Sequence, residues 1–259
     1  MTAGPRRDAR AVAGRIVQWC TSLGLFLAVW EWWIAPRFGS VFMAPPSEVW
    51  AKLRDWQSDG VLVPAAWETL SEALVGLALG SLVGVAAAVL LYRLPRLNRM
   101  LEPLVVALYA MPKIALVPLL FIWLGRDATP RLLFVSLSSF SILFIATATG
   151  LRTVDPHQLD MVRRLGASYG QVATKLLVPH SLGFVASGLA IAGPFALVSA
   201  LVVQMLQGTV GLGELLVTAS GYFDAAGVMA ATAVATALGL ALNQLTEALA
   251  AHHLRRRQT

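Results

Sequence analysis

The sequence predicts an all-α integral membrane protein with six transmembrane helices, and three observations lead to this fold class. Hydrophobic residues make up 57% of the 259-residue chain and charged residues only 13%, whereas a soluble domain carries about a quarter charged residues. The apolar residues stand in long blocks, and about 20 such residues span a bilayer core as a helix. Arginines lie at the ends of these blocks rather than on one face, so the formal charge of +6 does not indicate nucleic-acid binding.

Six apolar blocks supply the predicted spans. They are Ile16–Ala35, Leu70–Tyr92, Leu101–Leu124, Leu132–Leu151, Leu182–Leu206 and Ala225–Ala251. The first block ends in tryptophans that favour the membrane interface, so we interpret it as a retained helix and not a signal peptide. Pro103, Pro112 and Pro118 predict kinks or breaks in the third span, and Gly193-Pro194 predicts an interruption of the fifth.

The polar segments complete the predicted organisation. A basic tail (1–15) precedes the transmembrane domain (16–251), and a second basic tail (252–259) follows it. Between the first two spans, Ser47 is predicted to cap a short interfacial helix. A short loop is expected at 92–99 and a glycine-rich turn region at 208–221.

The distribution of positive charge predicts the orientation. If both termini are inside, fourteen lysines and arginines lie in inner segments and five in outer segments, with Lys113 inside a span. Positive residues are retained on the cytoplasmic side during insertion. We therefore expect both termini, and the long polar loop Asp155–Pro179, in the cytoplasm.

Three glycines define a close-packing face on the second span. Gly76, Gly80 and Gly84 recur every four residues and fall on one helix face. Such a face admits another helix backbone. Packing within the chain is the favoured interpretation, and a dimerisation seam is the alternative.

The sequence holds no catalytic or cofactor motif that we recognise. No lysine follows a glycine, so a GxxxxGK[ST] phosphate loop is absent, as are HExxH, CxxC and GxSxG motifs. His157 and His180 lack acidic or cysteine companions at metal-ligand spacing, and Cys20 is the only cysteine. We expect a chain that moves a solute and binds no cofactor or metal itself.

The loop Asp155–Pro179 is the longest polar interruption in the second half of the chain. Before Gly166, Leu159, Val162 and Leu165 share a helical face. After Gly166, Ser168 is predicted to cap a second short helix. This pattern fits either an amphipathic hairpin on the inner leaflet or a helical element that inserts into a partner's groove.

The apolar face of the second short helix is formed by Tyr169, Val172 and Leu176. Pro179 suits the first turn of the following span, where its missing N–H is not needed.

The spacing of this loop resembles the cytoplasmic EAA motif of binding-protein-dependent ABC importer permeases. Asp160-Met161-Val162 stand at the EAA positions, Gly166 follows after three residues, and Leu176–Pro179 close the motif after nine more. Only the acidic character of the first EAA position is retained. Further segments resemble the nitrate/sulfonate/taurine branch of that family, namely Ala44–Val49, Met111–Leu119, Trp123–Gly125, Val154–Pro156 and Gly211–Gly213.

The resemblance implies a type I ABC importer permease (MetI-like) fold in the bacterial inner membrane. Two such subunits, commonly identical, would form the pathway, separate ABC ATPase subunits would bind ATP and Mg²⁺, and an extracytoplasmic binding protein would deliver the solute. The implied coupling residues are Leu159, Asp160, Val162, Arg163, Arg164, Gly166, Ala167, Ser168, Tyr169 and Pro179. Asp160 is expected to meet a basic group of the ATPase, and Leu159, Val162 and Tyr169 to fill its groove.

The solute is less well defined. The branch suggests a small anion such as a sulfonate, taurine or nitrate, with Lys113, Ser199 and Gln204 as candidate pathway residues. For Lys113, a lysine near a helix break that snorkels or pairs with backbone carbonyls is favoured over an electrostatic role near the pathway. Ala190 and Gln204 replace an arginine and a glutamate of the family pattern, so a thiamine-precursor pyrimidine or another small heterocycle is the alternative solute.

Two classes outside this family stay open. A secondary transporter would usually show inverted repeats and intramembrane acids for ion coupling; no such repeat is seen, and Glu102 sits near a span end. A membrane scaffold would need only packed helices and a docking loop.

Overall fold

The computed structural model describes residues 18–19, 21–39 and 42–255, and over those ranges its regular structure is entirely helical. Four helices are long and apolar enough to cross a membrane. They are α4 (Leu62–Arg93), α7 (Ala128–Arg152), α10 (Val178–Gln207) and α12 (Ala225–Arg255). A fifth span results if the bent pair Pro95–Ala110 and Lys113–Leu124 counts as one. The predicted first span, Ile16–Ala35, lies partly outside the described residues, so the count of six is not tested.

The predicted third span is broken, but by only one of its three prolines. Helix α5 (Pro95–Ala110) ends before Pro112, and the chain turns by 92° into the 3-10 turn Lys113–Leu116 and α6 (Val117–Leu124). Pro103 lies inside α5, and Pro118 occupies the first turn of α6, where a missing N–H costs nothing.

The predicted interruption at Gly193-Pro194 is wrong, because α10 continues through Pro194 to Gln207. A proline inside a helix removes one backbone hydrogen bond and crowds the preceding turn. Here the residues on either side, Ala192 and Ala196, are fully buried in the core. Tertiary packing therefore keeps the helix continuous.

Two predicted loops are also shorter than expected. Only Leu94 separates α4 from α5, so Arg96 and Arg99 are helical. In the glycine-rich region, Gly208 ends α10 in the left-handed conformation (φ 70°), and α11 (Gly211–Gly221) follows almost at once.

The chain divides into two compact units, Met1–Leu62 with Leu216–Thr232, and Val63–Leu215 with Ala233–Thr259. In the first unit, the π-helix η1 (Trp30–Ile34) and α2 (Ala35–Phe38) precede α3 (Pro46–Ser58). The predicted cap Ser47 is wrong, because Pro45 is the N-cap residue. Ser47 instead donates its N–H and hydroxyl to the carboxylate of Glu31, at 3.0 and 2.6 Å.

An ion pair within the same unit joins α3 to the residue preceding α12. Lys52 Nζ lies 2.6 Å from Asp224 Oδ2. Burial opposes ionisation of Asp224, but hydrogen bonds from Lys52 and from the backbone N–H groups of Gly227 and Ala226 outweigh it. The pKa of Asp224 is therefore lowered.

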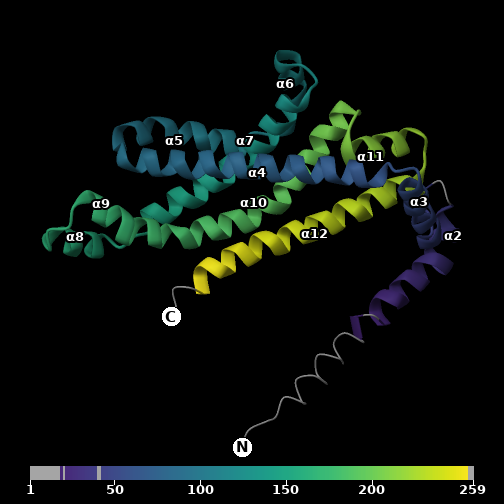
Figure 1. Cartoon of the computed structure of the whole chain (residues 1–259), viewed down its shortest axis with the longest axis horizontal. Coiled ribbons are helices and arrows are strands. Elements are labelled where there is room, and N and C mark those ends of the chain that lie inside the picture. Colours follow the sequence, from purple (N-terminus) through teal and green to yellow (C-terminus); the bar gives the residue numbers. More distant parts are fainter. Residues whose placement is uncertain (1–17, 20, 40–41, 256–259) are drawn as a thin grey trace, which may run out of the picture. The chain divides into compact units, whose positions relative to one another are not determined.

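The second unit is built on α4, α7 and α10 (Figure 1). Its main core combines small and branched residues, Ala73, Leu77, Val135, Leu143, Ala192, Ala196, Leu197, Ala200 and Leu242. Gly76, Gly80 and Gly84 face α7 so closely that an added Cβ would overlap Val135, the Ser136 carbonyl and the Phe140 carbonyl. The glycine face of α4 is thus occupied by α7 of the same chain.

Candidate functional site: a loop between two spans and a buried polar cluster

The polar loop lies between the end of α7 and the start of α10 (Figure 1). It consists of α8 (Pro156–Arg164), a turn at Gly166, the short α9 (Tyr169–Val172) and the π-helix η3 (Ala173–Leu177). The π turn leads directly into α10, so a single helix runs from Gly170 to Gln207. The loop is therefore joined to a membrane span without a flexible linker.

The start of α8 is fixed by an aspartate and a proline. The Asp155 carboxylate accepts a hydrogen bond of 2.8 Å from the His157 N–H, and Pro156 occupies the first helical position. Asp-Pro at a helix start satisfies one free N–H and removes another. This cap was not among the predicted site residues, although the dipeptide is a recognisable signal for it.

The turn after α8 requires a glycine at position 166. Gly166 has φ +82°, and its N–H donates to the Arg163 carbonyl while the Ala167 N–H donates to the Val162 carbonyl. These two bonds form a Schellman motif, which needs a residue in the left-handed region. The side chains of Val162 and Ala167 contact the same hydrophobic cluster, as is usual for this motif.

The start of α9 is closed by a capping box. The Gln171 N–H donates to Ser168 Oγ at 3.3 Å, and the Ser168 N–H donates to Gln171 Oε1 at 2.8 Å. The predicted capping role of Ser168 is thus seen in the structure. The side chain of Tyr169 lies outside the described part, and Pro179 occupies the first turn of α10.

The two faces of α8 have different surroundings. Leu159 and Val162 pack on a cluster of buried residues made by Leu151, Val154, Val172 and Leu177. Both side chains are thus partly buried against the protein itself, and their contact with a partner's groove stays a prediction.

The opposite face carries the exposed groups. An open groove of about 350 Å³ is lined by His157, Asp160, Met161, Arg164 and Leu165. Leu165 is 80% exposed and Met161 58% exposed. Leu165 differs from Leu159 and Val162 because α8 ends at Arg164 and the backbone turns there.

A buried polar cluster lies in the same unit, centred on Gln204 of α10. Gln204 is 0% exposed, and its Nε2 donates to Glu72 Oε2 at 2.9 Å. Its Oε1 lies 2.8 Å from Thr69 Oγ1 and accepts from the Gly213 N–H at 3.3 Å. Thr69 Oγ1 in turn accepts from the Leu212 N–H at 2.9 Å. These bonds connect α4, α10 and α11.

Arg131 extends the cluster to α7. Its guanidinium lies 3.1 Å from Glu68 Oε1 and 3.7 Å from Glu72 Oε2, and the residue is 5% exposed. Two carboxylates thus surround one buried guanidinium. Removing one member of such a buried group leaves a charge without compensation and is strongly destabilising.

The glycines of α11 leave the space that Gln204 occupies. A Cβ at Gly211 would overlap the Gln204 amide, and one at Gly213 would overlap the Gln204 Cβ. Gly211 also has φ +69°. The predicted Gly211–Gly213 segment is therefore packed against a predicted pathway residue.

The predicted pathway residues come from two elements: Lys113 begins the 3-10 turn before α6, and Ser199 and Gln204 lie on α10. Lys113 Nζ lies 3.5 Å from the Tyr109 carbonyl oxygen and 5.4 Å from the centre of the Tyr109 ring. Ser199 is buried within α10. Lys113 thus pairs with a backbone carbonyl, which was the favoured interpretation of that residue.

The fold and the loop together define the class of protein, a membrane permease subunit. The chain belongs to the family described as "Binding-protein-dependent transport system inner membrane component", whose model matches residues 80–259, well over half of the chain. The predicted resemblance to the permeases of ABC importers is therefore confirmed.

Individual relatives carry out transport of different solutes. The chain is 28% identical over 218 residues to the formylaminopyrimidine transport permease protein ThiX of Halalkalibacterium halodurans, covering 83% of this chain and 86% of that protein. It is 26% identical over 244 residues to the taurine transport system permease protein TauC of Escherichia coli, covering 90% and 88%.

A solved structure supports the fold. The TM-score to a chain of the MetNI methionine ABC transporter in an inward-facing conformation is 0.65, at 17% identity, covering 76% of this chain and 98% of that chain. At this identity the likeness shows the fold alone. The predicted all-helical permease fold is confirmed.

Proposed function

We propose that this permease moves a small solute, delivered by an extracytoplasmic binding protein, and is driven by separate ABC ATPase subunits. Those subunits hold ATP and Mg²⁺, so this chain is not itself an enzyme and binds no cofactor. A second permease subunit, in the simplest case another copy of this chain, completes the pathway.

The observation that carries the proposal is the exposed face of α8. Asp160, Met161, Arg164 and Leu165 line an open groove, while the other face of the helix is anchored in the protein. A firmly held helix that exposes both apolar and ionic groups fits insertion into a complementary groove of a partner. We assign that role to the ATPase, with Asp160 facing a basic group.

The connection from the loop to α10 supports mechanical coupling. Because one helix runs from Gly170 to Gln207, a displacement of the docked loop is passed on to the span. ATP-driven closure of the ATPases would then rock the spans between inward-open and outward-open states.

We place the protein in the bacterial inner membrane with the loop and both termini in the cytoplasm. The support is the excess of lysine and arginine in the corresponding segments, fourteen against five. This orientation puts α8 on the side where ATP is available.

For the solute we favour a small anion such as taurine, another sulfonate or nitrate. The taurine permease among the relatives supports this choice. The second candidate is a thiamine-precursor pyrimidine, which the relative ThiX supports.

The docking role is tested by placing a charge on each side of α8. The chain is reconstituted with the ABC ATPase that co-purifies with it and with a candidate binding protein, and ATP hydrolysis is measured. Leu165→Glu should lower the stimulated rate about tenfold, because a carboxylate would be buried in the contact. Gln158→Glu adds the same charge to α8 outside the groove and should retain the rate.

If Leu165→Glu retains the stimulated rate while the protein stays folded, the exposed face of α8 is not the docking surface. Loading the binding protein with taurine, nitrate or a formylaminopyrimidine in the same assay separates the solute classes. A solute that raises hydrolysis above the unloaded binding protein is recognised by the complex, its uptake into proteoliposomes shows transport, and failure of all three would contradict both solute proposals.

A further inference from the structure

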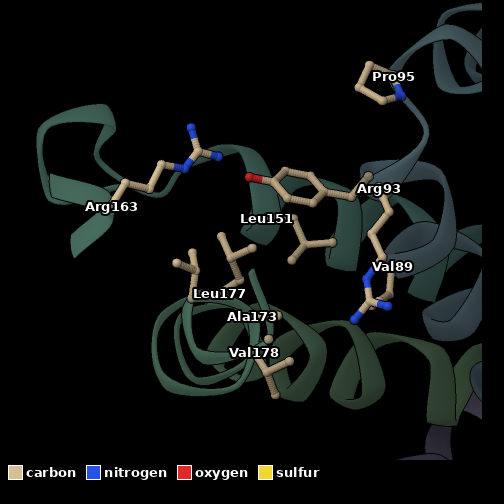
Figure 2. Close-up of a pocket in the computed structure, with 11 residues that line it drawn as sticks. Val89, Arg93, Pro95, Leu151, Arg163, Ala173, Leu177 and Val178 are labelled. Carbon is tan, nitrogen blue, oxygen red and sulfur yellow. The ribbon is translucent and has the colours of Figure 1, made fainter. Parts of the chain in front are cut away.

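A cavity of about 470 Å³ lies at the base of the polar loop, where the end of α4, the end of α7 and the π turn before α10 meet. Figure 2 shows Leu151, Leu177, Ala173 and Val178 together as its apolar floor, with Val89 beside Arg93. This volume is in the range of small-molecule sites, which are mainly apolar with a few polar groups that orient the ligand.

Two arginines stand at the rim of this floor. Figure 2 shows Arg93, the last residue of α4, and Arg163, from α8, on opposite sides of Leu151 and Leu177. Among the residues that the structure describes, neither guanidinium has a hydrogen bond or an ion pair, and no carboxylate lines the cavity. The cavity thus combines an apolar floor with two uncompensated positive charges.

The cavity also lies at a defined membrane level. The apolar helices α4 and α7 end beside it, at Arg93 and Arg152, and α10 begins beside it at Val178. Helix ends at which long apolar stretches give way to arginines lie at the level of the lipid head groups. Acidic phospholipids concentrate at this level, and basic pockets between spans bind their head groups.

We propose that this cavity is a binding site for an anionic phospholipid. Its acidic head group lies at the basic rim that Arg93 and Arg163 form, and part of an acyl chain covers the apolar floor. A free oxyanion would leave the floor empty, and a zwitterionic lipid would bring a phosphate but no net negative charge to the two guanidinium groups. The site differs from the groove on the outer face of α8 and does not depend on the docking role proposed for that groove.

The consequence is a link between the membrane and the loop. The cavity is walled by Arg163 and Gly170 of the loop on one side and by Tyr92 and Arg93 of α4 on the other. A bound lipid contacts both sides and therefore stabilises the loop against the spans. Removing it should loosen the segment through which the loop joins α10.

The test uses the full-length chain purified in a neutral detergent. Thermal unfolding is followed after adding phosphatidylglycerol, phosphatidylcholine with the same acyl chains, or inorganic phosphate, and native mass spectrometry counts retained lipid. Phosphatidylglycerol at about 100 times its Kd should raise Tm by about 5 °C. The other two additions should change Tm by less than about 1 °C.

Matched variants locate the effect. Arg93→Gln should remove most of the rise in Tm that phosphatidylglycerol causes, and Arg163→Gln should remove most of it too. Arg96→Gln removes a nearby arginine that does not line the cavity and should keep the shift. Ala173→Phe fills the floor without changing charge and should also remove the shift, while the lipid-free Tm stays near that of the unmodified chain.

Several results would overturn the proposal. An equal loss in Arg96→Gln would mean general attraction of lipid to a basic surface. A full shift with inorganic phosphate, or one retained in Ala173→Phe, would mean an anion site without a lipid chain. A shift caused by the ATPase in lipid-free detergent and abolished by Arg93→Gln would identify a protein contact. Absence of any shift with phosphatidylglycerol would exclude the site.

Discussion

At the scale of single residues, Gln204 connects three helices through one side-chain amide. It donates to Glu72 and accepts from Gly213, while Thr69 lies within hydrogen-bond distance of its oxygen. An amide suits this position because it supplies both a donor and an acceptor. A glutamate here would bring a second carboxylate against Glu72.

Exchanging the side chains of Glu72 and Gln204 tests whether the amide and the carboxylate act as a pair. Gln204→Glu alone should lower the free energy of unfolding by about 3 kcal/mol, because two buried carboxylates then face each other. Glu72→Gln alone should also destabilise, since Arg131 loses a counter-charge. The double variant Glu72→Gln/Gln204→Glu again has one amide and one carboxylate. It should therefore recover at least half of the free energy of unfolding that Gln204→Glu loses.

The measurement is thermal or denaturant unfolding of the three variants in detergent, analysed as a double-mutant cycle. If the double variant loses as much free energy of unfolding as the two single variants together, the residues do not act as a pair.

The polar cluster could not be predicted from local patterns in the sequence. Glu72 and Gln204 are 132 residues apart, and Arg131 was counted only as an outer charge. Helical periodicity places Glu68 and Glu72 on one face, which is the one available signal. It does not show which helix covers that face.

At the scale of elements, the loop shows which structural features a sequence pattern can predict. The turn at Gly166 and the cap at Ser168 were predictable, because each follows from a residue type with a specific backbone role. The direction of the apolar face of α8 was not, since an apolar stripe fits the protein's own core or a partner equally well. Leu159 and Val162 contact the core, whereas Leu165 remains exposed.

Two glycines of the loop make a matched pair. Gly166 has φ +82° and Gly170 lies in a helix, and an added Cβ would meet no atom within 4 Å at either position. Gly166→Ala should therefore destabilise the loop by about 1 kcal/mol through backbone strain alone. Gly170→Ala should stabilise it by about 0.5–1 kcal/mol, because alanine is the better helix former.

Limited proteolysis of the loop, with the rate measured for each variant, checks this pair. Equal cleavage rates in the two variants would contradict the role assigned to the Gly166 conformation.

At the scale of the whole molecule, the permease fold follows from composition and long apolar blocks, and the family match agrees with it. The interruption at Pro194 was wrongly predicted because packing on neighbouring helices overrides a local breaker. The division of the chain into two compact units had no signal in the sequence.

The proposed orientation is tested with single cysteines at the two ends of α7. The chain has one cysteine, so Cys20→Ser gives a cysteine-free background. His157→Cys, in the loop, should be protected from a membrane-impermeant maleimide in spheroplasts and react after lysis. Ala128→Cys, at the other end of the helix, should react in intact spheroplasts. The reverse labelling pattern would invert the topology and move the loop away from cytoplasmic ATP.

The continuity of the helix from Gly170 to Gln207 has a geometric consequence. At 1.5 Å per residue its 38 residues measure about 57 Å, nearly twice the thickness of a bilayer core. Such a rod acts as a lever, and a tilt of about 5° about one end displaces the other by about 5 Å. Gln204 lies three residues from the far end of this lever, so a small rotation imposed at α9 would strain the hydrogen bonds that hold α4 and α11 to α10.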